Sequence, residues 1–271
     1  MNQQKTYPIV LSIAGSDSSG GAGIQADLKT FSSLGVYGAT AITAITAQNT
    51  QGVHTQFALP PQLVYDQIIA VINDLRPSFI KIGMLANADI VLAVTEALSL
   101  YSIPIILDPV IVSTSGHRLL SVDAQEIIKE KLLPLSTLIT PNIPEAEILS
   151  SRTITGQDQF PQVATLLSHN NTTSVLLKAG HLNGDTLTDY FYNAEDGSIT
   201  PLPSKRVDTR NTHGTGCTLS SALAAALARG ENLTESALSA KRYIEQAIIA
   251  GAKYDIGHGH GPVNHFFALN S

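Results

Sequence analysis

Short apolar runs alternate with longer amphipathic segments from one end of the chain to the other. Apolar runs of about four to eight residues indicate buried strands, and apolar residues spaced about three or four positions apart indicate one face of a helix. The predicted strands are Ile9 to Ala14, Thr40 to Ala47, Phe79 to Ile82, Ile103 to Leu107, Thr137 to Thr140 and Ser174 to Lys178. Beyond them, Leu187 to Tyr192 and Ser198 to Val207 predict a β meander.

Helical periodicity fills most of the intervals between these strands. Ile24, Leu28, Phe31 and Leu34 share one helix face, and Gly35 is typical of a helix end. The other predicted helices are Pro61 to Asn73, Asn87 to Tyr101, Ser121 to Leu132, a stretch within Asp158 to Ser168, Gly216 to Arg229 and Leu233 to Ala250. This alternation predicts an α/β fold, a mostly parallel, doubly wound sheet with helices on both faces. No linker or repeat divides residues 1–271, so a single domain is expected.

Composition narrows the range of partners. Sixteen Lys and Arg stand against 22 Asp and Glu, for a net charge of −6, and no long basic run is present. Nucleic acid is therefore not an expected partner, because phosphate-backbone binding needs a basic surface. The content of 44% hydrophobic residues excludes disorder as the dominant state.

Cysteine use and hydropathy indicate the compartment. Cys217 is the one cysteine, so the chain has no internal disulfide, and the apolar run after the N-terminus is too short for a signal peptide. No apolar run approaches the roughly 18 residues of a membrane span. A cytoplasmic protein without a membrane partner is expected, and a homodimer is left open.

A glycine-rich loop, residues 15–23, follows the first strand, at the edge where such sheets bind ligands. Gly21-x-Gly23-x-x-Ala26 has the spacing of a dinucleotide fingerprint, but no acidic residue follows about 20 positions later to hold a ribose. A P-loop is also excluded, since no Gly-Lys-Ser/Thr follows. We interpret the loop as a ligand-binding loop, in which Asp27 is either part of the site or an ordinary acid in the first helical turn.

The segment from Asn211 to Thr218, Asn-Thr-His-Gly-Thr-Gly-Cys-Thr, precedes a predicted helix. Gly214 and Gly216 allow successive N–H groups to point into one concavity, and the helix start adds partial positive charge. The segment therefore predicts an anion site able to stabilise a phosphoryl group in transfer. Cys217 lies at the same helix start, where a thiol pKa is commonly lowered, so it is a candidate base or nucleophile as well as a candidate packing residue.

Several motifs resemble those of the ribokinase superfamily, specifically the hydroxymethylpyrimidine/phosphomethylpyrimidine kinases of thiamine biosynthesis. They comprise residues 14–30 (AGSDSSGGAGIQADLKT), 47–50 (AQNT), 81–85 (KIGML), 108–110 (DPV), 140–146 (TPNIPEA), 178–181 (KAGH), 211–218 and 259–263 (GHGPV). The resemblance implies a three-layer, ribokinase-like fold. It also implies ATP-dependent phosphorylation of 4-amino-5-hydroxymethyl-2-methylpyrimidine, then of its monophosphate to the diphosphate, at one site.

The resemblance assigns pyrimidine contacts to Gly15, Asp27, Gln48, Met84 and Val110, with Cys217 beside the hydroxymethyl group. These residue types suit a flat aminopyrimidine. A Gln amide offers a donor and an acceptor side by side, while Met and Val provide apolar walls.

For the phosphate side, the resemblance implies that Asn142 and Glu145 organise Mg²⁺ and its water around ATP, with Glu145 acting through water. Lys178 would reach the transferring phosphate oxygens, and Asp108 would share the metal or poise the acceptor. His213 would donate to phosphate or fix its loop. Gly214, Thr215 and Gly216 would form the anion site, and the proton acceptor is left open among Cys217, Asp108 and water.

Three histidines near the C-terminus, His258, His260 and His265, raise a zinc alternative, which we discount because their spacing lacks a helix or cysteine partners. Three other functions are weighed against the leading hypothesis. They are a pyridoxal-type vitamin kinase, a non-catalytic pyrimidine sensor and a nicotinamide-dependent dehydrogenase.

Overall fold

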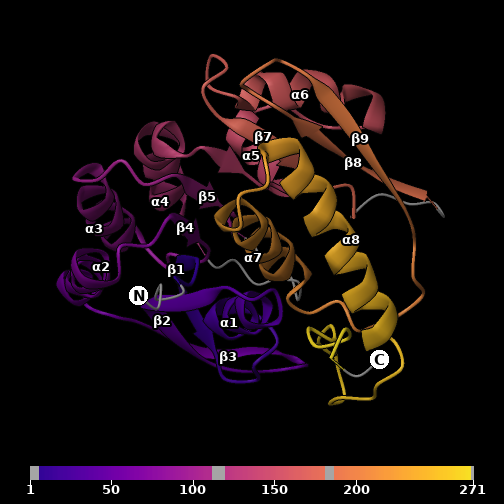
Figure 1. Cartoon of the computed structure of the whole chain (residues 1–271), viewed down its shortest axis with the longest axis horizontal. Helices are drawn as coiled ribbons and strands as arrows, with labels where there is room; N and C mark the ends of the chain where they lie inside the picture. The colour runs from indigo at the N-terminus through magenta and orange to yellow at the C-terminus, as the bar shows by residue number, and fades with distance from the viewer. Residues whose placement is uncertain (1–5, 112–119, 181–185, 270–271) are drawn as a thin grey trace, which may run out of the picture.

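A nine-stranded sheet runs through the computed structural model, which describes residues 6–111, 120–180 and 186–269 (Figure 1). The strands lie in the order β3-β2-β1-β4-β5-β6-β7-β8-β9. Their bounds are β1 Ile9–Asp17, β2 Tyr37–Asn49, β3 Gly52–Ala58, β4 Phe79–Ile82, β5 Ile105–Leu107, β6 Leu138–Ile139, β7 Ser174–Leu177, β8 Thr186–Tyr192 and β9 Ile199–Lys205. The strands from β2 through β7 in this order pair in parallel, whereas β3, β8 and β9 pair antiparallel at the two edges.

Helices cover both faces of this sheet, which confirms the predicted three-layer α/β fold (Figure 1). One apolar core packs the helices α2 to α6 on one face, and a second core packs α1, α7 and α8 on the other. The helix bounds are α1 Gly23–Ser33, α2 Pro61–Leu75, α3 Ala88–Ser99, α4 Val122–Ile127, α5 Ile143–Ser150, α6 Phe160–Leu167, α7 Thr215–Ala228 and α8 Leu233–Gly251. A π-helical turn over Ile128–Leu132 extends α4. No helix within the described ranges combines the length and the apolar character needed to cross a membrane.

Two elements have no counterpart among the predicted ones. Strand β3 is mostly exposed and polar, so it lacks an apolar run and is held by antiparallel pairing with β2. Helix α5 is 8 residues long and has Glu145 among its buried residues, so no uninterrupted apolar face marks it in the sequence. It begins at a capping box, in which Asn142 and Glu145 each accept a hydrogen bond from the other's backbone N–H.

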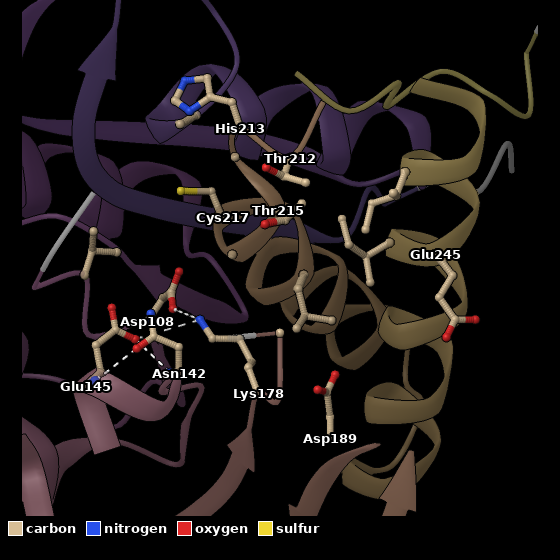
Figure 2. Close-up of a pocket in the computed structure, with 18 of the residues that line it drawn as sticks. Asp108, Asn142, Glu145, Lys178, Asp189, Thr212, His213, Thr215, Cys217 and Glu245 are labelled. Carbon is tan, nitrogen blue, oxygen red and sulfur yellow. Dashed lines mark hydrogen bonds and ion pairs between the residues drawn. The ribbon is translucent and has the colours of Figure 1, made fainter. Parts of the chain in front are cut away.

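The parallel strands end at one common edge, and there they place the residues that follow them. Gly83 and Met84 follow β4, Asp108 follows β5, and Lys178 follows β7. An isolated parallel bridge joins Asn142 to Lys178 and extends this edge past β6. The start of α7 lies beside the same edge, so the predicted chemistry of distant loops converges there (Figure 2).

Candidate active site

A cavity of about 1080 Å³ opens at this edge of the sheet. It is larger than one small ring requires, since pockets for drug-sized ligands fall in the range of about 300–1000 Å³. The residues predicted for the site that line it are Gly15, Gln48, Met84, Asp108, Val110, Asn142, Glu145, Lys178, His213, Gly214, Thr215, Gly216 and Cys217. Asp27 is the exception.

The turn that starts α7 has the backbone of an anion site. Gly214 caps the helix with a φ of 79°, a left-handed conformation that favours glycine. A Cβ at this position would lie 1.8 Å from the carbonyl oxygen of Gly21, so the turn also packs directly on the first glycine loop. Within the described part of the chain, the N–H groups of Gly216 and Cys217 have no hydrogen-bond partner and are available to an anion.

Opposite this turn, Asp108, Glu145 and Lys178 form one charged cluster (Figure 2). Lys178 Nζ lies 2.9 Å from Asp108 Oδ1 and 4.0 Å from Glu145 Oε2. A Cβ built on Gly216 would be 3.4 Å from Lys178 Nζ, which places this ammonium group against the anion turn. The cation and the free N–H groups therefore face the same space.

The two carboxylates of the cluster titrate differently. Burial alone would raise the pKa of Asp108, but the ammonium groups of Lys178 and Lys81, with hydrogen bonds from Lys178 and Thr140, hold it below its ordinary value. Burial raises the pKa of Glu145 to about 7, and the neighbouring Asp108 charge adds to this rise against the opposing effect of Lys178. Asp108 is thus ionised at neutral pH, whereas Glu145 is near its midpoint.

Cys217 does not have the lowered thiol pKa that its place at a helix start predicts. Burial raises the pKa of this thiol to about 11, and the carboxylates of Asp27 and Asp108 add to the rise while Lys81 opposes it. The expectation failed because enclosure by protein outweighs the helix dipole here. The side chain lines the cavity as a neutral thiol.

Asp27 does not line the cavity, contrary to its expected contact with the pyrimidine. It is fully buried in α1 and accepts hydrogen bonds from Ser12 (2.6 Å), Ser221 (2.7 Å) and Lys81 (2.9 and 3.0 Å). Lys81 is also fully buried. Burial alone would lower the pKa of its ammonium group, but the negative charge of Asp27 outweighs this effect and the pKa is raised. The pair ties α1, β1, β4 and α7 together behind the cavity wall, a role that the sequence did not indicate for Lys81.

The side of the cavity near β1 and β2 has the character of a ring pocket. Gly15 leaves room for Met84, because a Cβ on Gly15 would lie 2.4 Å from the Met84 methyl carbon. Met84 and Val110 supply apolar surface, and Gln48 supplies an amide. The backbone of Gln48 is held against the glycine loop by Ser18, whose hydroxyl accepts from its N–H (2.9 Å) and donates to its carbonyl (2.8 Å).

Asp17 lies within the motif of residues 14–30 and lines the cavity, although no role was predicted for it. Its carboxylate accepts hydrogen bonds from the backbone N–H groups of Ser19, Gly21 and Ala22. Its Oδ2 also lies 2.8 Å from His213 Nε2. His213 therefore lies with the ring pocket and joins the glycine loop to the anion turn.

A second lobe of the cavity lies between β8, β9 and α8, and no residue of it was predicted. Its walls are mixed. The apolar residues are Leu187, Pro203, Val207, Ile244, Ile248 and Ile249, and the charged residues are Asp189, Lys205, Arg206, Lys241 and Glu245. Asp189 bridges Lys241 (2.7 Å) and the N–H of Ala179 (2.7 Å), and Glu245 lies further along α8 (Figure 2). The apolar residues of these walls have the sequence pattern of ordinary core residues. Their position beside a cavity therefore becomes evident only from the fold.

The segment that follows α8 runs beside the site, from the β2–β3 turn to the anion turn, and we call residues 256–263 the C-terminal strap. The N–H groups of Gly259 and His260 donate to the hydroxyl and the carbonyl of Thr50 at the β2–β3 turn. The N–H of His213 donates to the carbonyl of Gly261 at 3.0 Å. His258 and His260 are exposed, whereas His265 is buried with its Nε2 3.0 Å from the Thr218 hydroxyl, so the three histidines do not converge.

Free N–H groups at a helix start, a half-buried lysine and two carboxylates around one cavity are the parts that phosphoryl transfer requires. Together with the three-layer fold, they define the chain as a phosphotransferase of the ribokinase-like class.

Comparison with known proteins identifies the family. A profile of the phosphomethylpyrimidine kinase family matches residues 17–264, and the chain belongs to this family. It is 47% identical to the hydroxymethylpyrimidine/phosphomethylpyrimidine kinase of Rhizobium meliloti, over 95% of this chain and 97% of that protein.

Solved structures agree with this assignment. A phosphomethylpyrimidine kinase from Clostridium difficile is similar with a TM-score of 0.79 and 42% identity, over 89% of this chain and 99% of that one. A pyridoxal kinase from Bacillus subtilis, in complex with ADP, is similar with a TM-score of 0.89 and 32% identity, over 98% and 100% of the two chains.

Proposed function

We propose that the chain transfers the γ-phosphoryl group of ATP to the hydroxymethyl group of 4-amino-5-hydroxymethyl-2-methylpyrimidine and then phosphorylates the monophosphate, both at one site. The observation that supports this most directly is the placement of the anion turn between a ring pocket and a second lobe of the same cavity. A ring in the first and a nucleotide in the second would meet at Gly214 to Cys217. The substrate names follow from the family.

The residues divide this work by position. Gln48, Met84, Val110 and Gly15 hold the ring. The N–H groups of Gly216 and Cys217 and the ammonium of Lys178 bind the transferring oxygens, where charge develops.

The proton of the hydroxymethyl group goes to Asp108 in this proposal. Asp108 is ionised and faces the cavity, whereas the Cys217 thiol, with a pKa of about 11, keeps its own proton and packs beside the hydroxymethyl group. A loose phosphoryl-transfer transition state demands little of a base, so the low pKa of Asp108 suffices.

The donor set also fits a magnesium ion. The carboxylates of Asp108 and Glu145 lie in one cluster, and burial raises the pKa of Glu145 to about 7. A cation bound between them would stabilise the ionised form of Glu145. Glu145 and Asp108 would hold Mg²⁺ through water, and the ion would neutralise phosphate charge. Cytoplasmic location and organisation as one domain belong to the same proposal, and the single continuous sheet supports the latter.

The test is ADP release that depends on both the pyrimidine and Mg²⁺. Gln48→Ala is expected to raise mainly the KM for the pyrimidine, and Glu145→Ala to weaken mainly the use of Mg²⁺-ATP. Gln62→Ala and Glu126→Ala are matched controls, because both residues lie on the surface and, among the described residues, each bonds to a neighbour on its own helical segment. Equal effects of the two site variants on both substrates would contradict the division of roles.

The structural similarity to pyridoxal kinase favours a second candidate activity on pyridoxal-type rings. Comparison of kcat/KM on the pyrimidine and on pyridoxal decides between the two. A preference for pyridoxal would overturn the proposed substrate but not the phosphotransferase class.

A further inference from the structure

The side-chain amide of Gln48 lies between two partners, Thr46 and His213. Gln48 Nε2 lies 3.4 Å from His213 Nε2, and Gln48 Oε1 lies 3.1 Å from the Thr46 hydroxyl. An amide has a donor end and an acceptor end of nearly the same shape, so its partners decide which way round it lies. The orientation of the Gln48 amide is correct only if each of its two contacts pairs a donor with an acceptor.

At the first contact, His213 Nε2 must carry a hydrogen. Its other partner, 2.8 Å away, is Asp17 Oδ2. Burial would raise the pKa of Asp17, but hydrogen bonds from His213 and Ser19 and from backbone N–H groups lower it to about 2, so the group is a carboxylate and only accepts. With Nε2–H donating to Asp17, an amide NH₂ of Gln48 on the same nitrogen would place donor against donor.

At the second contact, the single hydrogen of the Thr46 hydroxyl lies near two acceptors. The Thr46 hydroxyl lies 3.0 Å from the carbonyl oxygen of Ser16 as well as 3.1 Å from Gln48 Oε1, and both of these atoms are acceptors. A hydroxyl has one hydrogen to donate, but it can also accept. If the Gln48 amide is rotated by 180°, its NH₂ donates to Thr46, Thr46 donates to Ser16, and the Gln48 carbonyl faces the N–H of His213. Both contacts favour the same rotation independently. The one N–H of His213 can be shared between the Asp17 carboxylate and the Gln48 carbonyl, whereas two donors that face each other repel.

We propose that Asp17, acting through His213, and Thr46 lock the Gln48 amide with its oxygen toward His213 and its nitrogen toward Thr46. They are positioning residues that determine the orientation in which the pyrimidine ring binds to the Gln48 amide. This inference rests on the proposed function.

The direction matters because of the order of groups on the ring. An amide reads an aminopyrimidine by donating to N3 and accepting from the 4-amino group, and the 5-hydroxymethyl group is the next substituent. In the locked orientation N3 lies toward Thr46 and the amino group toward His213. The hydroxymethyl group then falls toward Gly214, the residue after His213, where the anion turn begins. The opposite orientation would point it away from the turn.

The experiment compares kcat/KM for the amino ring with that for 5-hydroxymethyl-2-methylpyrimidin-4-one, in which N3 carries a hydrogen and the 4-substituent accepts. We expect the wild-type protein to prefer the amino ring by about 100-fold or more, because both hydrogen bonds are reversed in the oxo ring. His213→Phe and Thr46→Val release the amide and are expected to lower this preference at least about tenfold. Thr46→Ser keeps the hydroxyl and is expected to retain it.

A merely structural role would lower kcat/KM for both rings by the same factor and leave the ratio unchanged, and that result overturns the inference. Thr46→Val is nearly isosteric, so it serves if His213→Phe does not fold. If the wild-type protein does not phosphorylate the amino ring, the proposed function fails. The ratio of the two rings' dissociation constants, measured without ATP in the same variants, then still decides whether the amide is locked.

Discussion

The buried pair of Lys81 and Asp27 makes the sharpest prediction about stability. Both side chains are fully buried, with 0% of either exposed to solvent. In Lys81→Met the carboxylate of Asp27 would keep its hydroxyl donors, Ser12 and Ser221, but would lose both contacts to the ammonium group. An uncompensated charge would then be left in the interior.

Breaking a buried pair on one side costs about 3–5 kcal/mol. For a chain of this size each kcal/mol corresponds to about 2–4 °C, so the melting temperature is expected to fall by roughly 6–20 °C. The double variant Lys81→Met with Asp27→Asn removes both charges and is expected to recover most of this loss. Lys129→Met is the control, because Lys129 pairs with the exposed Glu126 and such pairs contribute about 1 kcal/mol or less.

The assay is equilibrium unfolding in urea for the four proteins, followed by circular dichroism. A loss in Lys81→Met no larger than in Lys129→Met would refute the reasoning. So would a double variant less stable than the single one, since charge without a partner would then not be the cause.

Three further predictions concern the site. Cys217→Ser is expected to keep kcat within about tenfold of the wild type, because a neutral thiol is no base; a loss of about 10²-fold or more, with an ionisation missing from the pH–rate profile, would contradict this. Burial raises the pKa of Glu145 from 4.5 to about 7, so the folded protein holds this proton longer than the unfolded chain. The free energy of unfolding from this group therefore falls as pH rises from about 4.5 to about 7; Glu145→Gln should remove that part of the slope in urea titrations, and an unchanged slope would exclude the assignment. Gly214→Ala combines a φ of 79° with a clash against Gly21, whereas Gly197→Ala has a φ of 71° and open space. Gly214→Ala should abolish most turnover, whereas Gly197→Ala should leave turnover intact and lower the free energy of unfolding by only about 1 kcal/mol. A similar loss of turnover in both variants would show that backbone strain alone, and not the clash at the anion turn, is the cause.

The parallel strands were predictable because each is a buried apolar run, and the loops after them follow from the topology of any doubly wound sheet. Strand β3 was missed because its exposed, polar residues resemble a loop and only the edge of the sheet orders it. The position of Cys217 at a helix start could be predicted from the sequence. Its pKa depends on burial and on the charges of Lys81, Asp27 and Asp108, which come from other elements and leave no local pattern.

Two functional side chains left signals that pattern reading did not resolve. Lys81 stands inside an apolar strand, and a charge in such a run indicates a buried partner, but the partner is 54 positions away. Asp17 ends β1 within a recognised motif, and its link to His213 spans 196 positions. Contacts across such separations are decided by the fold as a whole, so the roles of these residues become clear only in the folded structure.

The C-terminal strap has a consequence for truncated forms of the protein. Every strand and helix that the structure describes precedes the strap. A chain cut before Gly261 would therefore keep all of these elements but lose the carbonyl that holds His213 beside the anion turn. A proteolytic nick or a premature stop codon in the strap would thus impair activity more than secondary structure.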